Sequence, residues 1–173
     1  TYRTQSIEGD STYVANYNIN ISVTAVNGNA VISSHNNVSS GNYAEGTPLT
    51  LTATASEGYG FVNWTKNGAV IEGDEEITVT VDVPAEYVAN FAQYTIEASV
   101  NPTAGGSVDV VSTTDGNQST GSYAHGATAT LSTTAAEGYT FVNWTKGEEI
   151  VGTNTTYRTQ SIEGDSTYVA NYN

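Results

Sequence analysis

The chain has 173 residues and carries 18 acidic against 4 basic side chains, for a formal net charge of −14. Phosphate backbones and anionic lipid headgroups repel such a chain, so nucleic acid and membrane surfaces are poor candidate partners. No apolar run approaches the roughly 18 residues of a membrane span, so we expect no membrane insertion. Cysteine and methionine are absent, which excludes disulfides, thiolate metal sites and thiol nucleophiles.

Two stretches of the chain are identical. Residues 1–18 and residues 156–173 both read TYRTQSIEGDSTYVANYN. A shared fold does not fix every surface Thr, Gln and Ser, so this identity indicates a recent duplication within a longer array with a period of 155 residues. We expect residues 1–18 to be the C-terminal strands of a preceding repeat, or donor strands. We also expect any native residue after Asn173 to correspond to Ile19.

A weaker repeat divides the period into two modules. Residues 41–66 match residues 121–146 at a constant offset of 80, with 17 of 26 positions identical. The expected domains are therefore a first β-repeat module at residues 19–91 and a second at residues 92–173, after the leading fragment.

Alternation of apolar and polar residues predicts short strands in both modules. The inward-facing runs start at Ile19, Leu49, Ile77, Tyr87, Tyr94, Val108 and Ala129. Residues 33–44 are the expected place for a helical turn, and residues 157–162 depart from the pattern of 77–83, which indicates a bulge or register change. We predict an all-β fold, sandwich or β-grasp-like, of tandem small antiparallel modules joined by continuous strands, with little or no helix.

The joints between modules carry no linker composition. The alternation runs unbroken from Tyr13 to Ala25, so the last strand of one module is predicted to continue as the first strand of the next. At the other joint the inward phase changes between Phe91 and Tyr94, and we expect a bulge or twist near residues 92–93. Neither joint is rich in Pro, Gly or Ser, which favours a stiff rod.

One block of residues carries a resemblance to a known family. Gly58-Tyr59-Gly60-Phe61-Val62-Asn63-Trp64 has a close partner at residues 138–144, and each follows Gly-x-Tyr-x-x-Gly and precedes Tyr-x-Ala-Asn-Phe/Tyr. The chain resembles, essentially along its whole length, the divergent B-repeat modules of internalin-like bacterial surface proteins. The resemblance implies a secreted or surface-attached prokaryotic protein whose β-rich modules form stalks or adhesive arms. It implies no common ligand site, and the strict period and linkerless joints favour a filament over a stalk.

The aromatic residues of this block are the candidates for ligand binding. Trp64 and Trp144, with Tyr59 and Tyr139, would form a platform on which a sugar stacks. The alternative is that they fill the core. Because the chain has only three Leu and no Met, each module needs large aromatic residues to bury area, and one Trp buries up to about 250 Å². The core role is favoured.

Two acidic turns are the candidates for a metal ion. Residues 72–76 and 163–165 concentrate carboxylates but lack the spaced oxygen ligands of a calcium loop. We therefore expect solvated turn charge rather than bound Ca²⁺, and no cofactor. His35 and His125 occupy different module positions and have no second metal-ligand type beside them. A catalytic triad, a phosphate-binding glycine loop and a zinc spacing are missing, so we predict that the chain is not an enzyme.

Lysine and asparagine recur at matching places in the two modules. Lys66 with Asn90, and Lys146 with Asn171, are candidates for a Lys–Asn isopeptide crosslink. The simpler alternative is that each lysine stem packs over an aromatic ring while its charge faces an acidic surface.

The sequence favours a structural function. We expect a segment of a long extracellular or cell-surface tandem-repeat protein that forms a stiff stalk, thread or filament, with neighbouring copies of the repeat as end-to-end partners. One alternative is a filament subunit whose residues 1–18 complete a neighbour by strand exchange. Another is a surface adhesin or carbohydrate-binding module that binds a glycan or a host protein through Trp64 and Trp144.

Overall fold

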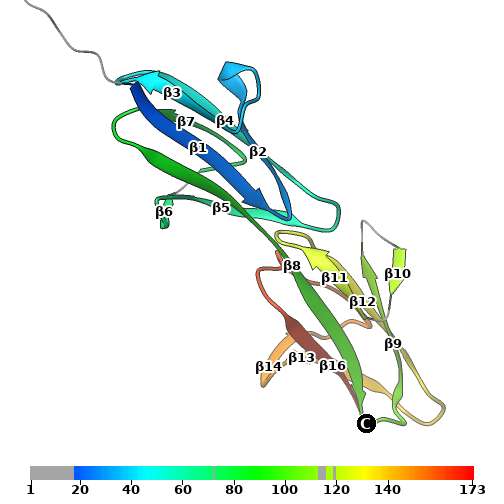
Figure 1. The fold of residues 1–173 in the computed structure, drawn as a ribbon. Coiled ribbons are helices and arrows are strands. Elements are labelled where there is room, and N and C mark those ends of the chain that lie inside the picture. Colours follow the sequence, from blue (N-terminus) through cyan, green and yellow to red (C-terminus); the bar gives the residue numbers. More distant parts are fainter. Residues whose placement is uncertain (1–17, 72, 113–115, 119) are drawn as a thin grey trace, which may run out of the picture.

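The computed structural model describes residues 18–71, 73–112, 116–118 and 120–173, and most of these lie in strands. The predicted all-β fold is confirmed. One 3₁₀ turn, η1 (Ser33–His35), lies in the stretch where the sequence predicted a helical turn. Within the described residues there is no α-helix, and no helix is long and apolar enough to cross a membrane. The strands form two modules that follow one another along an elongated molecule (Figure 1).

The first module is a sandwich of two sheets. Its larger sheet has the order β3-β1-β8-β5-β6, with β3 (Ser40–Ala44), β1 (Asn18–Val26), β8 (Ala85–Asn101), β5 (Gly60–Lys66) and β6 (Ala69–Ile71). Its smaller sheet has the order β2-β4-β7, with β2 (Gly28–Ile32), β4 (Pro48–Ala55) and β7 (Glu76–Thr80).

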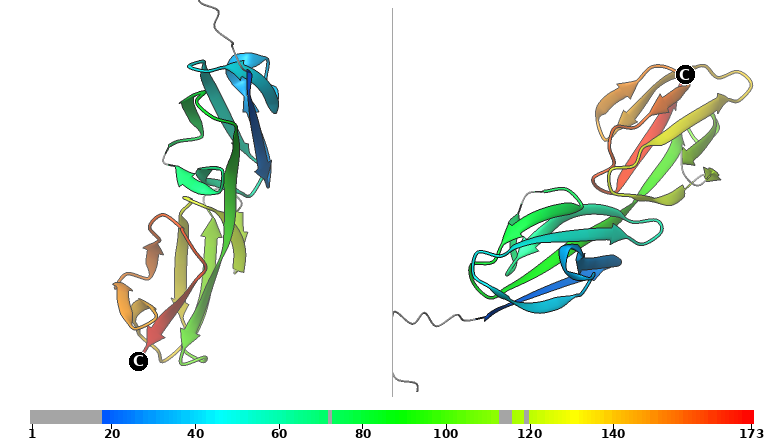
Figure 2. Two further views of the ribbon diagram at one scale, coloured as in Figure 1. Left: turned by 60° about the vertical axis from the view of Figure 1, so that its left-hand side comes forward. Right: turned by 90° about the horizontal axis from the view of Figure 1, so that it is seen from above.

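The second module repeats this arrangement (Figure 2). Its larger sheet has the order β11-β8-β16-β13-β14, with β11 (Thr120–Ala124), β16 (Ser166–Tyr172), β13 (Phe141–Lys146) and β14 (Glu149–Gly152). Its smaller sheet has the order β10-β9-β12-β15, with β10 (Gly116–Gln118), β9 (Gly106–Ser112), β12 (Ala129–Ala135) and β15 (Thr156–Arg158).

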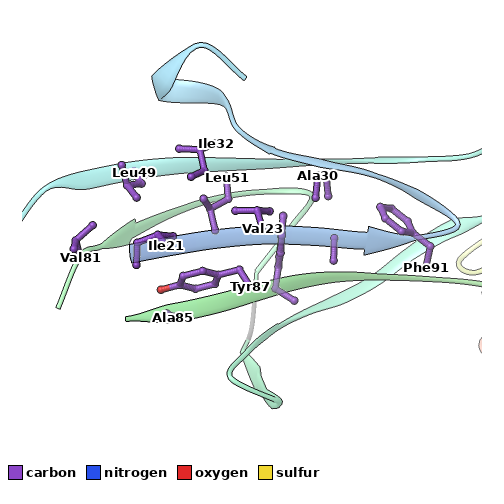
Figure 3. Packing of buried hydrophobic residues seen from close by; sticks show 13 residues of the cluster. Ile21, Val23, Ala30, Ile32, Leu49, Leu51, Val81, Ala85, Tyr87 and Phe91 are labelled. Carbon is purple, nitrogen blue, oxygen red and sulfur yellow. The ribbon is translucent and has the colours of Figure 1, made fainter. Parts of the chain in front are cut away.

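Each module has its own hydrophobic core between its two sheets. The first core joins alternate residues of β1, β4 and β8, as Figure 3 shows. Its largest fully buried side chains are Trp64, Tyr87, Ile21, Ile32, Leu49 and Leu51. The second core is a separate cluster built in the same way around Ile96, Leu131, Trp144 and Tyr168. In the alternating pattern of the sequence, the apolar residues therefore point into these cores and the polar residues point to solvent.

Turn residues take the conformations that tight hairpins require. Asn67 and Gly68, between β5 and β6, have φ values of 50° and 82°. Two central residues with positive φ are typical of a type I′ turn, whose twist matches that of the flanking strands. The Asn67 side chain also accepts a hydrogen bond from the Glu86 backbone N–H at 2.9 Å, which ties this hairpin to the start of β8.

The first and last strands of each module are neighbours and run parallel. In the first module β1 pairs with β8, from Ile21 opposite Ala85 onward. In the second module β8 pairs with β16, from Ile96 opposite Ser166 onward. Parallel neighbours point the same way, so the chain enters each module at one end and leaves it at the other end.

A single strand, β8, belongs to both modules. It runs unbroken for 17 residues, with its first half in the first module and its second half in the second module (Figure 1). Of the bulge or twist expected near residues 92–93, the bulge is not present in β8. The register irregularity of this region lies on the partner strand β5, between Phe61 and Asn63.

The change of inward phase has another cause. Tyr87, Ala89 and Phe91 point into the first core, whereas Tyr94 and Ile96 belong to the second. Because successive side chains of a strand point to opposite faces, the two cores lie on opposite faces of β8 where the modules meet. The continuous joint predicted from Tyr13 to Ala25 lies partly outside the described residues.

The departure expected at residues 157–162 is present. Val81 and Ile162 make the same backbone hydrogen bond in their modules, each donating its N–H to the turn before β4 or β12. Val79 pairs with β4, and Thr159 takes the corresponding place beside β12. One residue separates Val79 from Val81, whereas two separate Thr159 from Ile162. The second module therefore has one extra residue in this segment.

Candidate functional site

The two tryptophans are core residues. Trp64 and Trp144 are both 0% exposed. Their ring N–H groups donate to the backbone oxygens of Asp74 and Asn154, each at 3.1 Å. A sugar cannot stack on a fully buried indole, so the core role that the sequence favoured is the one that the structure shows.

The two candidate tyrosines are half-buried and pack against the edges of the cores. Tyr59 lies at the joint between the modules, where its hydroxyl accepts a hydrogen bond from Gln93 Nε2 at 3.1 Å. Tyr139 holds the matching place at the far end of the second module. Neither tyrosine is brought together with an exposed tryptophan.

The joint between the modules is a close backbone contact. The N-terminus of β5 and the C-terminus of β11 meet end to end along one edge of β8, where Gly60 is opposite Ala92 and the backbone N–H of His125 donates to Ala92 O at 3.1 Å. A Cβ atom at Gly60 would overlap the backbone of His125, whose nitrogen would lie 2.8 Å away. The ring of His125 also lies against Tyr94, with 6.0 Å between ring centroids.

This contact was not predicted from the sequence. The one signal for it is that the first module has Gly60 where the second has Thr140, within an otherwise conserved block.

The lysines pack over tyrosines and do not face the asparagines. Lys66 Nζ lies 5.9 Å from the ring centroid of Tyr87 and 2.9 Å from Asp82 Oδ1. The hydrogen bond to Asp82 raises the pKa of Lys66, and the same bond lowers the pKa of Asp82. Asn90 instead donates to Asn63 Oδ1 at 2.8 Å, so its amide is not presented to the lysine.

The second module has the same arrangement with one difference. Lys146 Nζ lies 5.8 Å from the ring centroid of Tyr168, and Asn171 donates to Asn143 Oδ1 at 2.8 Å. Among the described residues no carboxylate lies within ion-pair distance of Lys146. Glu163 follows Ile162 as Asp82 follows Val81, but it makes no ion pair with Lys146.

A pocket of about 460 Å³ opens beside Lys146. Tyr157, Tyr168 and Val151 supply its apolar surface. Lys146, Gln160, Ser161, Ser166, Glu149, Glu163 and Asp165 supply its polar groups. The pocket therefore offers a cation, carboxylates, an amide and hydroxyl groups beside two tyrosine rings whose centroids are 5.9 Å apart.

Comparison with known protein families assigns both modules to one family. The model of the divergent InlB B-repeat domain matches residues 19–95 and again residues 96–173. The chain belongs to the divergent InlB B-repeat family. Its modules are tandem β-rich repeat domains of the kind found in bacterial surface proteins. The boundary between the two matches falls inside β8, as expected where one strand serves two B-repeat modules.

Other comparisons add little to this assignment. No curated protein matches the chain. Among solved structures, the major pilin protein T-13 of Streptococcus pyogenes is similar at 10% identity and a TM-score of 0.38, with 92% of this chain and 97% of the pilin covered. The Bacillus anthracis TIE protein is similar at 10% identity and a TM-score of 0.36, with 91% of this chain and 34% of that protein covered.

The charged turns and histidines of the B-repeat modules form no metal site among the described residues. No group of three or more His, Asp or Glu side chains there is placed to hold an ion. Glu72, from the first acidic turn, lies outside the described residues. His35 Nδ1 is hydrogen-bonded to Ser34 Oγ at 3.0 Å, and His125 lies at the joint, so the fold does not bring the two histidines together.

Proposed function

We propose that this chain is a segment of a stiff extracellular thread, built from tandem B-repeat modules and attached to a bacterial surface. The observation that carries the proposal is that β8 is the last strand of one module and the first strand of the next. With 17 residues at about 3.3 Å each, β8 is a continuous element of roughly 55 Å.

The parallel pairing of first and last strands supports an extended array. Because the chain enters each module at one end and leaves at the other, each added module lengthens the molecule. An antiparallel pairing of the terminal strands would bring both module ends to the same side and require a linker to continue.

The joint supports stiffness. Bending at residues 92–93 would separate Gly60 from His125 and break the Gln93–Tyr59 hydrogen bond. It would also part the β5 and β11 ladders, which meet there on one edge of β8. Flexible connections between domains have few such contacts.

The charge supports a thread that stays separate from its neighbours. Residues 19–173 hold 16 acidic and three basic residues, or −13 for each period. The net charge of an array grows in proportion to its number of periods. Like-charged surfaces oppose the lateral pairing of exposed strand edges.

The alternative of strand exchange between separate subunits has less support. Donation of residues 1–18 to a neighbour needs a module that lacks these strands. The second module already contains its own copy of this sequence as β15 and β16, paired with β12, β13 and β8. Native material boiled in denaturant should therefore remain longer than one period. Release of subunits of about 18 kDa would overturn the covalent thread.

Electron microscopy of the native material tests the thread itself. We expect thin unbranched fibres whose axial repeat matches two modules. Globular, monodisperse particles would contradict the proposal.

A second candidate function is glycan binding, favoured by the pocket beside Lys146. Sugar hydroxyls need both donors and acceptors, and here Lys146 and Gln160 donate while Glu163 accepts, beside the rings of Tyr157 and Tyr168. The volume falls within the range of small-molecule sites. The pocket would display neutral sugars once per period along the thread.

Binding of the intact chain to an array of neutral glycans tests this second function. We expect Lys146→Ala and Glu163→Gln to abolish binding, and Lys66→Ala, at the matched place in the first module, to leave it unchanged. Equal binding by all of these variants, or no binding by the wild-type chain, would overturn it and leave the thread unaffected.

A further inference from the structure

We infer that a thread built from this period contains two different kinds of joint. At the joint inside this chain the two modules lie on opposite faces of their shared strand. Where a second copy of residues 19–173 follows Asn173, the modules lie on the same face of theirs. This inference rests on the proposed thread and specifies how consecutive copies of the chain fit together.

The number of residues between inward-facing side chains differs at the two joints. Two residues separate Phe91 from Tyr94 at the internal joint. One residue, Asn173, would separate the buried Tyr172 from the Ile19 of the following copy. Side chains alternate between faces with every residue. One residue fewer between the modules therefore rotates the next module by about half a turn around the shared strand, and brings it about 3.3 Å closer.

Backbone hydrogen bonds also place the two modules on opposite faces of β8 at the internal joint. Ala92 is opposite Gly60 and accepts the His125 N–H, so β5 and β11 occupy one edge of β8. Thr95 has the opposite parity and directs its N–H to the other edge, where Asp165 Oδ1 accepts it at 2.7 Å in front of β16. The strands β1 and β16 therefore share that second edge. Since both modules have the same strand order, β5 can share an edge with β11, and β1 with β16, only if the two cores lie on opposite faces of β8.

At the second joint, the backbone hydrogen bonds place the strands from the two modules on opposite edges of the shared strand. Asn173 and Thr140 exchange both backbone hydrogen bonds, each at 3.0 Å, so Asn173 faces the edge beside β13. In β1 the odd-numbered residues face β3, as shown by the Val23 N–H, which donates to Ser39 O at 2.7 Å. The Ile19 that follows Asn173 would therefore face the opposite edge. The strands β13 and the next β3 would lie on opposite edges of the shared strand.

The residues at the two points of contact, Gly60 and Thr140, fit these two arrangements. Gly60 is required at the internal joint because a side chain there would overlap His125. The corresponding pair at the second joint is Thr140 and the Glu45 of the next copy. If β13 and β3 met end to end, the Thr140 side chain would overlap the Glu45 backbone. Placement on opposite edges removes this overlap.

The thread would accordingly repeat every two modules, although all its modules have one fold. Features of the second module, such as the pocket beside Lys146, would recur only once in each repeat.

Spin-label distances test the inference in a chain of two periods, made by adding a second copy of residues 19–173 after Asn173. The absence of native cysteine makes the labelling specific. Cysteines replace corresponding exposed residues of the two modules, one pair at a time: Thr54 with Thr134, Glu76 with Thr156, and Glu86 with Thr167. Each pair is measured once across the internal joint and once across the second joint.

We expect narrow distance distributions at both joints, with a set of three distances at the second joint that differs from the set at the first. Narrow distributions with the same three distances at both joints would overturn the two kinds of joint and leave the stiff thread standing. Broad distributions at both joints would overturn the thread itself.

A paired variant checks the cause. Insertion of one glutamine after Asn173, combined with Thr140→Gly, should convert the distances of the second joint to those of the internal joint. The insertion without Thr140→Gly should fail to do so, because the threonine side chain then meets the Glu45 backbone. Unchanged distances in the combined variant would contradict the inference.

Discussion

At the scale of single residues, the tryptophans explain how modules with few large aliphatic residues form a core. Trp64 and Trp144 are the largest fully buried side chains, and each also fixes a loop by its ring N–H. The sequence predicted this core role because Leu and Met are scarce. It did not identify the loop carbonyls as partners, because Asp74 and Asn154 are ten residues away in segments without periodicity.

The first prediction concerns these indoles. Trp64→Phe removes a buried ring portion and leaves the Asp74 carbonyl without its donor, so it should lower the free energy of unfolding by about 2 kcal/mol. Urea unfolding followed by circular dichroism measures this change. Trp144→Phe should have a similar effect in the second module. A loss below about 0.5 kcal/mol for both variants would contradict the buried positions of the rings.

The second prediction concerns the ion pair of Lys66 with Asp82. Asp82→Asn should lower the pKa of Lys66 toward its ordinary value, as measured by NMR titration of its side chain. The lowered pKa of Asp82 means that its contribution to stability is present at neutral pH and is lost as the pH falls through that pKa. The raised pKa of Lys66 means that its contribution is lost as the pH rises through the folded value. An unchanged Lys66 titration in the variant would show that the pair is not formed in solution.

At the scale of elements, the sequence was a good guide to strands and a poor guide to their neighbours. Alternation around Ile19, Leu49 and Tyr87 identified which faces are buried. It cannot show that β1 lies beside β8, because periodicity carries no information on pairing. The phase change between Phe91 and Tyr94 fits either a bulge or cores on opposite faces, and only the structure distinguishes the two. The sequence indicated the departure at residues 157–162, but not the pocket that Gln160 and Ser161 help to line.

The third prediction tests the end-to-end contact of β5 and β11. Gly60→Ala places a Cβ against the His125 backbone and should destabilise the chain by about 1–3 kcal/mol, or displace the second module. The matched control is Thr140→Ala, which should be close to neutral because that position already carries a side chain. Chemical denaturation, with amide NMR shifts around Gln93, measures both. A neutral Gly60→Ala would show that the strands do not meet.

At the scale of the whole molecule, the length and the net charge are best described for one period of the repeat. The 173 residues are one period of 155 with the 18-residue sequence of its end repeated, and the net charge of −14 becomes −13 for each period of an array. A thread of such periods gains length with every module and gains charge in proportion. The stiffness of such a thread depends on one property, the rigid continuation of β8 from one B-repeat module into the next.

The most direct test of this property is a comparison of residual dipolar couplings from the two modules of this chain in one alignment medium. Rigidly joined modules share one alignment tensor, in magnitude and in orientation relative to the structure. We predict a single tensor that fits the couplings of both modules together. Two tensors of different magnitude would show that the modules move independently, and would contradict a rigid joint.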